Sequence, residues 1–161
     1  MEMNKEAVMK FLPHREPFLF VDAIEKVEHN KELVAGELLS QKEVVGSKVT
    51  AIYRTKEDHP IFAGHFPGKP IFPGVCQVEM MAQSSSFCLK DCVESGKDVE
   101  MDVALVSVSA AKFRKPIFPG MDLVIETECT KSRGPMLENI CKVFHNGELM
   151  SEATVMASVR L

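Results

Sequence analysis

The chain has no tryptophan, a single tyrosine and no apolar run near the ~20 residues that cross a bilayer. It also lacks an excess of positive charge, because 19 Lys and Arg stand against 23 Asp and Glu, for a net charge of -4. A basic excess supplies most of the affinity for nucleic acid. These absences exclude an integral membrane protein and argue against general binding of nucleic acid.

The cysteines are poorly arranged for a disulfide framework. The five cysteines are odd in number and form no CxxC motif, and the pair Cys88 and Cys92 has no histidine close in sequence. The first 16 residues carry charges through their only apolar stretch, unlike a signal peptide. We therefore expect reduced thiols, a cytoplasmic location and no metal site.

With 161 residues, 45% of them hydrophobic and 26% charged, the chain suits a single globular domain over 1–161. Asn4 and Pro13 bracket an amphipathic helix over 4–12. Asn146-Gly147 indicates a hairpin turn. Apolar alternation predicts strands from 18–21 onward and over 33–39, 44–53, 99–113, 123–130, 137–145 and 149–159.

A stiff loop and a long helix interrupt these strands. Residues 60–74 read PIFAGHFPGKPIFPG and hold four of the nine prolines, which excludes a regular element. A helix is predicted over 75–93, with Gly96 as its C-cap. The hexapeptide KPIFPG at 69–74 recurs at 115–120 and is interpreted as one turn used twice. The prediction is an α+β fold, an antiparallel β-sheet wrapped around one long central helix.

Two side chains stand out in this region. Glu79 falls within a helical stripe that includes Val75, Val78 and Ala82, where an unpaired carboxylate is costly or has a raised pKa. Gln83, one turn later, can orient it. A solvated glutamate at the edge of the stripe fits the periodicity equally well. The other side chain, His65, lies in the stiff loop, which suits a general base, although a lone loop histidine is more often solvated.

Gly74 completes this constellation at the predicted start of the helix. Backbone amides there have no partner within the helix and can stabilise a developing enolate. The other histidines, at 14, 29, 59 and 145, are interpreted as structural or solvated. Base, carboxylate and free amides together favour proton abstraction beside a carbonyl with loss of a β-hydroxyl.

The segment GHFPGKPIFPGVCQVEMMAQ closely resembles the signature of FabZ-type (3R)-hydroxyacyl-acyl carrier protein dehydratases of type II fatty acid synthesis. LPHREPFLFVD and KFRKPIFPG look like two further blocks of that family, in the expected order. The resemblance runs from about Leu12 to the C-terminus. It implies a hotdog fold and a homodimer with active sites at the subunit interface, commonly assembled as a hexamer of three dimers.

The resemblance also implies roles for individual residues. His65 would abstract the C2 proton, the partner's Glu79 would protonate the departing 3-hydroxyl, and the Gly74 amide would polarise the thioester carbonyl. Phe66, Val75 and Gln83 would complete the substrate-binding set. The product would be a trans-2-enoyl thioester, with no metal or redox cofactor, because the acyl chain arrives on the phosphopantetheine of acyl carrier protein.

Acyl carrier proteins are acidic, so we expect a locally basic docking surface despite the net charge of -4. Lys112, Arg114 and Lys115 are its candidates, although a solvated strand edge explains them equally well. The chain departs from the family at Glu16, in PGMDL and in VSVSAA before Lys112. These departures leave the tunnel mouth and the chain-length preference open.

Several alternatives stay open. A dehydratase that also isomerises the double bond is the nearest, although the FabA-type family usually has aspartate where Glu79 stands. A specialised polyketide or aryl-polyene dehydratase fits the same residues. A hotdog thioesterase would not be expected to keep the HFPG loop. A non-catalytic acyl-binding subunit is the alternative outside catalysis. The presence of both His65 and Glu79 argues against it, because such a subunit would not need them.

Overall fold

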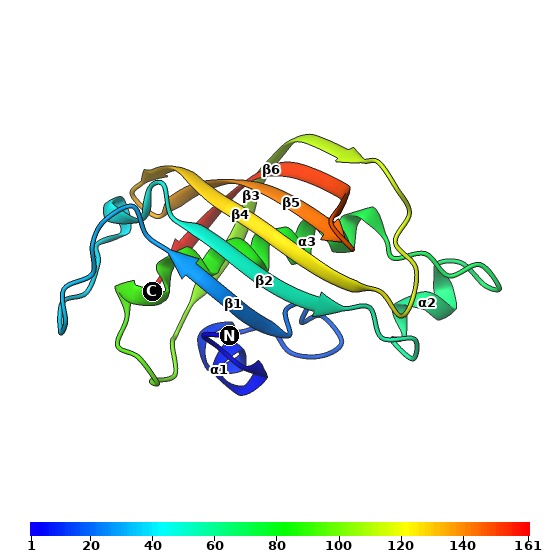
Figure 1. Ribbon diagram of the computed structural model, residues 1–161, viewed down its shortest axis with the longest axis horizontal. Coiled ribbons are helices and arrows are strands. Elements are labelled where there is room, and N and C mark those ends of the chain that lie inside the picture. Colours follow the sequence, from blue (N-terminus) through cyan, green and yellow to red (C-terminus); the bar gives the residue numbers. More distant parts are fainter.

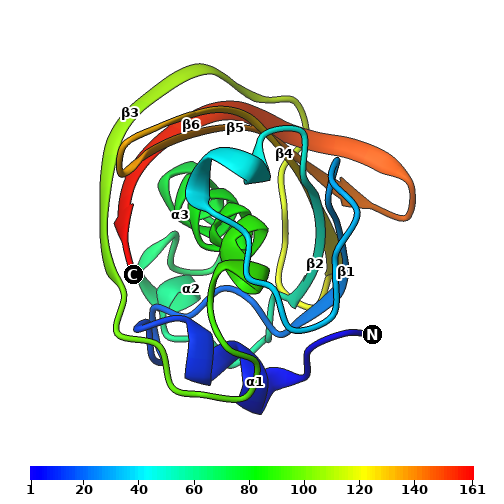
Figure 2. The ribbon, with the colours of Figure 1, turned by 90° about the vertical axis from the view of Figure 1, so that its left-hand side faces the viewer.

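The computed structural model describes residues 1–161 as one curved antiparallel sheet wrapped around a helix (Figures 1 and 2). The sheet has six strands in the order β1-β2-β4-β5-β6-β3. The strands are β1 Ala23–Glu28, β2 Lys48–Arg54, β3 Asp102–Phe113, β4 Asp122–Arg133, β5 Met136–His145 and β6 Glu148–Arg160. The expected architecture is confirmed.

The helices also follow the sequence pattern closely. They are α1 Lys5–Phe11, α2 Ile61–Gly64 and α3 Gly74–Ser85, with 3₁₀ segments η1 Gln41–Val44 and η2 Ser86–Cys92. The Asn4 side chain accepts a hydrogen bond from the Ala7 amide, as expected of the cap of α1. α1 lies below the open side of the sheet in Figure 2. None of the helices is long and apolar enough to cross a membrane.

The second half of the predicted central helix is a 3₁₀ helix rather than an α-helix. From Ser86 the helix continues as the 3₁₀ segment η2 to Cys92, and its C-cap is Val93 rather than Gly96. The Ser85 and Ser86 hydroxyls both donate to the Ala82 carbonyl, at 2.9 and 3.1 Å. Serine hydroxyls that take backbone carbonyls in this way compete with regular α-helical bonding.

Four other expectations are wrong. Residues 18–21 form no strand, because the first strand begins only at Ala23. Residues 33–39 form no strand, because Gly36 has a φ of +83° and the Glu37 amide donates to Val34 in a turn. Residues 60–74 are not wholly irregular, since α2 makes one helical turn. The two KPIFPG copies also end differently, because Gly74 opens α3 whereas Gly120 has a φ of +79° in a turn.

The copies nevertheless meet, through a 2.7 Å hydrogen bond from the Phe72 amide to the Ile117 carbonyl. This contact holds the proline-rich loop against the segment that follows β3. The core beneath the sheet is one cluster of 33 buried apolar residues, to which α3 contributes Cys76, Met80 and Met81. The stiff loop is therefore fixed at both ends to the packed body of the protein.

Candidate active site

His65 follows α2 directly and is held by the loop that leads to α3. Phe66 and Lys69 exchange backbone hydrogen bonds of 3.0 and 2.8 Å, which close a tight turn. The Ile71 amide donates to the His65 carbonyl, and His65 Nδ1 lies 2.8 Å from the Ile71 carbonyl oxygen. A carbonyl only accepts, so Nδ1 carries a hydrogen, and in the neutral ring Nε2 then has the free lone pair. This tautomer is the one that a general base needs.

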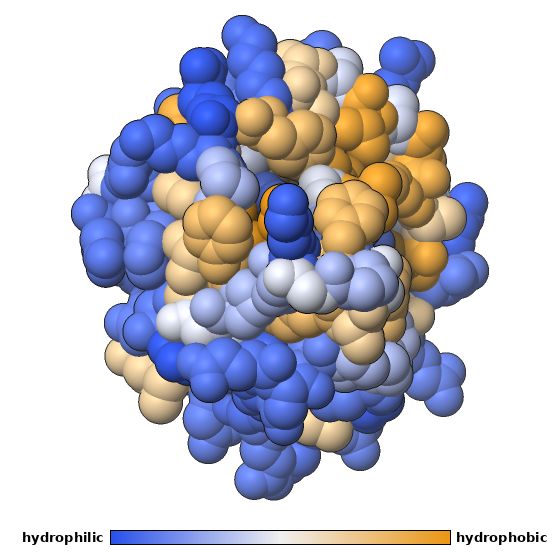
Figure 3. Space-filling view, turned by 90° about the vertical axis from the view of Figure 1, so that its right-hand side faces the viewer, coloured by the Kyte–Doolittle hydropathy of each residue, from blue (hydrophilic) through white to orange (hydrophobic).

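An open cleft of about 350 Å³ adjoins His65 at the end of the molecule seen in Figure 3, where apolar side chains lie among hydrophilic ones. The Phe66 ring stacks on the imidazole at a centroid distance of 4.0 Å. The cleft is lined by His65, Ile71, Phe72, Gly74, Gln77, Phe113, Arg114, Lys115 and Pro116. A substrate entering it meets the base and the first turn of α3 together.

The first turn of α3 presents uncapped backbone to this cleft. The residue before it, Pro73, makes no side-chain capping bond, so the first amides of the helix are available to an oxyanion. A Cβ atom at Gly74 would stand 3.1 Å from the Phe113 ring. Glycine at this position therefore lets the ring approach the helix start closely.

Glu79 lies farther along α3, at a separate cavity of about 70 Å³. Its Oε1 accepts a 2.9 Å hydrogen bond from Gln83 Nε2, which confirms that Gln83 orients the carboxylate. His14 Nε2 faces the same oxygen at 3.3 Å. Hydrogen bonding from His14 lowers the pKa of Glu79 below its usual value, with a smaller contribution from Gln83, although burial acts in the opposite direction.

The predicted stripe faces the sheet only in part, because Ala82 is buried whereas the positions before it are not. Val75 is 80% exposed, and Val78 and Glu79 are only partly buried. The buried residues of α3 instead include Cys76, Met80 and Gln83. Because the partly covered side of α3 carries Glu79, the carboxylate sits at the margin of the core and can be reached from outside the chain.

His14 is the site residue that the sequence interpretation missed. Its side chain is 19% exposed, close to the 21% of Glu79 beside it. The signal that could have found it is its place inside LPHREPFLFVD, one of the blocks that carry the family resemblance. The remaining histidines are structural as expected: His29 bridges Ser47 and Asp91, and His59 binds the Pro17 carbonyl.

The structure thus divides the predicted residues between two places. His65, Phe66 and Gly74 lie together at the large cleft, whereas Glu79 and Gln83 line the small cavity. No hydrogen bond or ion pair joins His65 to Glu79 within the chain. Val75 lies at the start of α3, next to Gly74.

The three basic candidates follow one another at the end of β3. Arg114 and Lys115 line the His65 cleft, and each is paired with a glutamate of β6, namely Glu152 and Glu148. Lys112 forms no ion pair. Arg114 and Lys115 therefore place two basic groups in the lining of the cleft, which does not include Lys112.

The chain is similar to known dehydratases over nearly its whole length. A family model described as ApeI dehydratase, of the ApeI-like family, matches residues 41–151. The 3-hydroxyacyl-[acyl-carrier-protein] dehydratase FabZ of Anaeromyxobacter sp. (strain Fw109-5) is 34% identical, covering 96% of this chain and 89% of that protein. FabZ of Ehrlichia canis (strain Jake) is 31% identical over 99% of this chain and 97% of that one.

Solved structures share the fold. The dehydratase heterocomplex ApeI:P from Xenorhabdus doucetiae superposes with a TM-score of 0.67 at 16% identity, over 96% of this chain and 91% of that one. The fluoroacetyl-CoA thioesterase FlK superposes with a TM-score of 0.57 over 72% of this chain and 87% of that one, at 15% identity. These likenesses establish the hotdog fold.

Proposed function

Because the chain belongs to the family of the FabZ and ApeI-like dehydratases, we propose that it dehydrates (3R)-3-hydroxyacyl-acyl carrier protein in type II fatty acid synthesis. It is a dehydratase, and the assigned substrate is the one that the names of its FabZ relatives state. The single observation that carries the chemistry is the tautomer of His65. Its Nδ1 hydrogen is bound to the Ile71 carbonyl, which leaves Nε2 free beside an open cleft.

In this reaction His65 Nε2 removes a proton from C2 of the thioester. Negative charge then develops on the thioester oxygen, and the uncapped amides at Gly74 stabilise it. Phe66 and Val75 flank this position and contact the substrate. The site is thus arranged for proton abstraction next to a carbonyl.

Glu79 acts as the general acid in the second half of the reaction. The C2–H electron pair forms the C2–C3 double bond, the C3–O bond breaks, and the Glu79 proton joins the departing hydroxyl as water. Gln83 holds the carboxyl for this transfer. The product is a trans-2-enoyl thioester, and no metal or redox cofactor takes part.

We further propose that the active site forms between two copies of the chain, with His65 of one working with the partner's Glu79. Two observations support a homodimer. His65 and Glu79 line different cavities of one chain. Leu105, Val106 and Val108 are 40–50% exposed on β3, which ends the sheet with an unpaired edge. Three such dimers would form the hexamer common in the family.

Acyl carrier protein is the proposed macromolecular partner. Its acidic surface would meet Lys112, Arg114 and Lys115, of which the last two line the cleft into which the phosphopantetheine arm must reach. The five cysteine thiols are free, which is typical of proteins in a reducing compartment and supports a cytoplasmic reaction.

The test is turnover of a short (3R)-3-hydroxyacyl-acyl carrier protein, followed by the absorbance of the enoyl thioester. Wild type is expected to turn over, whereas His65→Ala and Glu79→Gln each lose on the order of 10²- to 10⁴-fold in kcat, the usual contribution of a general base or acid. Circular dichroism and gel filtration should show both variants folded and assembled.

Product analysis in the same assay separates dehydration from isomerisation, because a 3-enoyl product would indicate an isomerase as well. Full activity of Glu79→Gln would remove the acid assignment. Absence of turnover in folded wild type with a competent carrier would favour the non-catalytic acyl-binding alternative.

A further inference from the structure

The carboxyl group of Glu79 is held by only one of its two oxygens. Gln83 Nε2 and His14 Nε2 both face Oε1, at 2.9 and 3.3 Å. Oε2 has no hydrogen-bond or ion-pair partner within the chain. Two donors on one oxygen fix the orientation of the carboxyl plane, and they leave Oε2 as the atom that can exchange a proton with a substrate.

The two ring nitrogens of His14 have different surroundings. Its Nδ1 atom is buried and has no hydrogen-bond partner. A hydrogen on this nitrogen would be a buried donor without an acceptor, which is costly. The hydrogen that His14 can donate is therefore the one on Nε2, the atom that faces Glu79.

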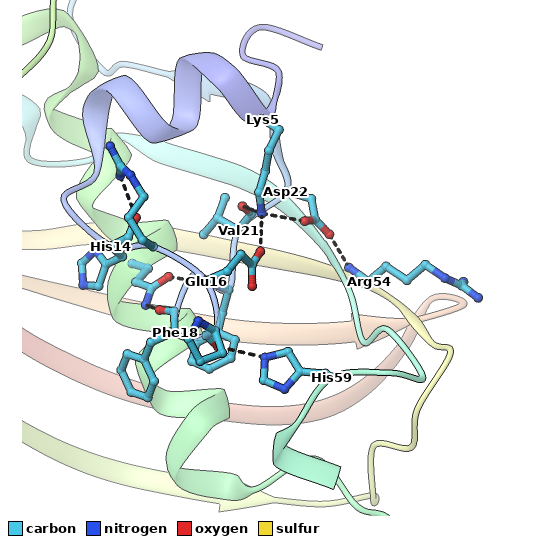
Figure 4. A network of polar contacts seen from close by, with 12 residues as sticks. Lys5, His14, Glu16, Phe18, Val21, Asp22, Arg54 and His59 are labelled. Carbon is cyan, nitrogen blue, oxygen red and sulfur yellow. Dashed lines mark hydrogen bonds and ion pairs between the residues drawn. The ribbon is translucent and has the colours of Figure 1, made fainter. Parts of the chain in front are cut away.

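Hydrogen bonds to backbone carbonyl groups hold the segment that carries His14. The Arg15 guanidinium donates to the carbonyl oxygens of Met9, Leu12 and His14, at 2.7–2.9 Å. This binds the residues around His14 to the end of α1. The backbone at His14 is consequently fixed from within its own segment (Figure 4).

The same segment is tied to the central helix and to the loop before α2. Gln83 accepts from the Phe20 amide at 2.8 Å and donates to the Phe18 carbonyl at 2.9 Å. His59 Nε2 binds the Pro17 carbonyl at 2.8 Å. Gln83 therefore orients Glu79 and also holds the segment that carries His14, so that the three side chains form one hydrogen-bonded unit.

No other basic group competes for this carboxylate. Among all ion pairs of the chain, the only one made by Glu79 is with His14. The cavity around them is otherwise apolar, lined by Ala82, Val103, Leu105 and Ala157. The other titratable side chain that Glu79 affects is Cys76, whose pKa is raised by burial and then by the carboxylate charge. In such surroundings a single hydrogen bond to the carboxylate is strong.

We propose that His14 is a positioning residue for the acid step: its Nε2–H binds Glu79 Oε1, presents Oε2 to the leaving hydroxyl and stabilises the carboxylate formed there. The inference rests on the proposed acid role of Glu79. In the step itself, the Oε2–H proton passes to the C3 oxygen as the C3–O bond breaks. The O–H electron pair remains on the carboxylate, and the hydrogen bond from His14 Nε2–H stabilises the resulting negative charge.

The decisive comparison is between His14→Phe and His14→Gln. Phenylalanine keeps a planar ring but has no donor, whereas glutamine offers an N–H of similar reach. With the donor gone, burial dominates and the pKa of Glu79 rises. His14→Phe is expected to lower the limiting kcat, measured on the acid side of the pH profile where Glu79 is protonated, roughly 10- to 100-fold, less than loss of a general acid itself, with little change in KM.

The pH profile separates positioning from a merely structural role. Because the acid must be protonated, a raised pKa of Glu79 moves the alkaline limb of kcat in His14→Phe to higher pH. His14→Gln should recover much of kcat and shift that limb back toward the wild-type position. Thermal melting and gel filtration of both variants accompany the kinetics, and His14→Leu replaces His14→Phe if the latter does not fold.

Unchanged kcat in His14→Phe, or equal losses in both variants without movement of the alkaline limb, would overturn the inference. If wild type fails to turn over the acyl carrier protein substrate, the proposed function fails instead. The inference is then decided by a ¹³C NMR titration of the Glu79 carboxyl, assigned with Glu79→Gln. A higher pKa in His14→Phe than in wild type supports it, and an equal pKa rejects it.

Discussion

At the scale of single residues, hydrogen bonds set the properties of the two proposed catalytic side chains. His65 is held as a base by the carbonyl of Ile71, across a turn. Gln83 was expected to orient Glu79 and does so, whereas the contact with His14 was not expected. His14 and Gln83 stabilise the ionised form of Glu79, and this is why its pKa is lowered although its partial burial acts in the opposite direction.

This lowered pKa predicts how stability changes in acid. A carboxyl whose folded-state pKa lies below its ordinary value of 4.5 contributes stability above that ordinary pKa and loses it as pH falls through the lowered one. Glu79→Gln should therefore show a shallower fall in the free energy of unfolding below about pH 4.5 than wild type. Urea denaturation at a series of pH values measures this. The exposed Glu25, changed to Gln, is the control, and equal slopes in Glu79→Gln and wild type would contradict the pairing.

At the scale of elements, β3 differs from every other strand. Its residues are exposed along almost the whole length, whereas β4, β5 and β6 alternate between buried and exposed positions. β3 pairs only with β6, so its other edge offers free backbone groups. Exposed apolar side chains beside a free edge are typical of a strand that pairs with another chain.

Val106→Asp is expected to weaken the proposed dimer, because it places a charge beside that free edge. Sedimentation equilibrium should show a shift toward monomer, together with loss of dehydratase activity. Ile140→Asp, at an exposed apolar position on the interior strand β5, is the matched control and should leave the assembly intact. A fully dimeric Val106→Asp variant would place the interface elsewhere.

At the scale of the whole molecule, the separation of His65 from Glu79 has a direct consequence for activity. If each site takes its base from one chain and its acid from the other, a mixed dimer of His65→Ala and Glu79→Gln contains one intact site. Random exchange of the two inactive variants should then restore about a quarter of wild-type activity. The measurement is activity after co-refolding at equal concentrations, with each variant refolded alone as control. No recovery despite proven mixed dimers would show that both residues act from the same chain.

The sequence by itself determined the strand and helix types, the hairpin at Asn146-Gly147, the stiff loop around His65 and the pairing of Glu79 with Gln83. These features depend on local periodicity, backbone conformation and near neighbours along one helix. Asn146 and Gly147 adopt positive φ values of 47° and 77°, as such a turn requires. The prediction failed at 33–39, where Gly36 turns a strand-like apolar run into an exposed loop.

Only the tertiary structure decided which side of α3 is buried and which residue faces Glu79. A helical stripe can be read from spacing, but the side that meets the sheet depends on where the strands lie. Val75 therefore became exposed while Met80 and Gln83 were covered. Likewise, His14 and Glu79 are 65 residues apart in the chain. They meet because the segment after α1 is fastened to Gln83 and His59, a contact between distant segments that no local pattern encodes.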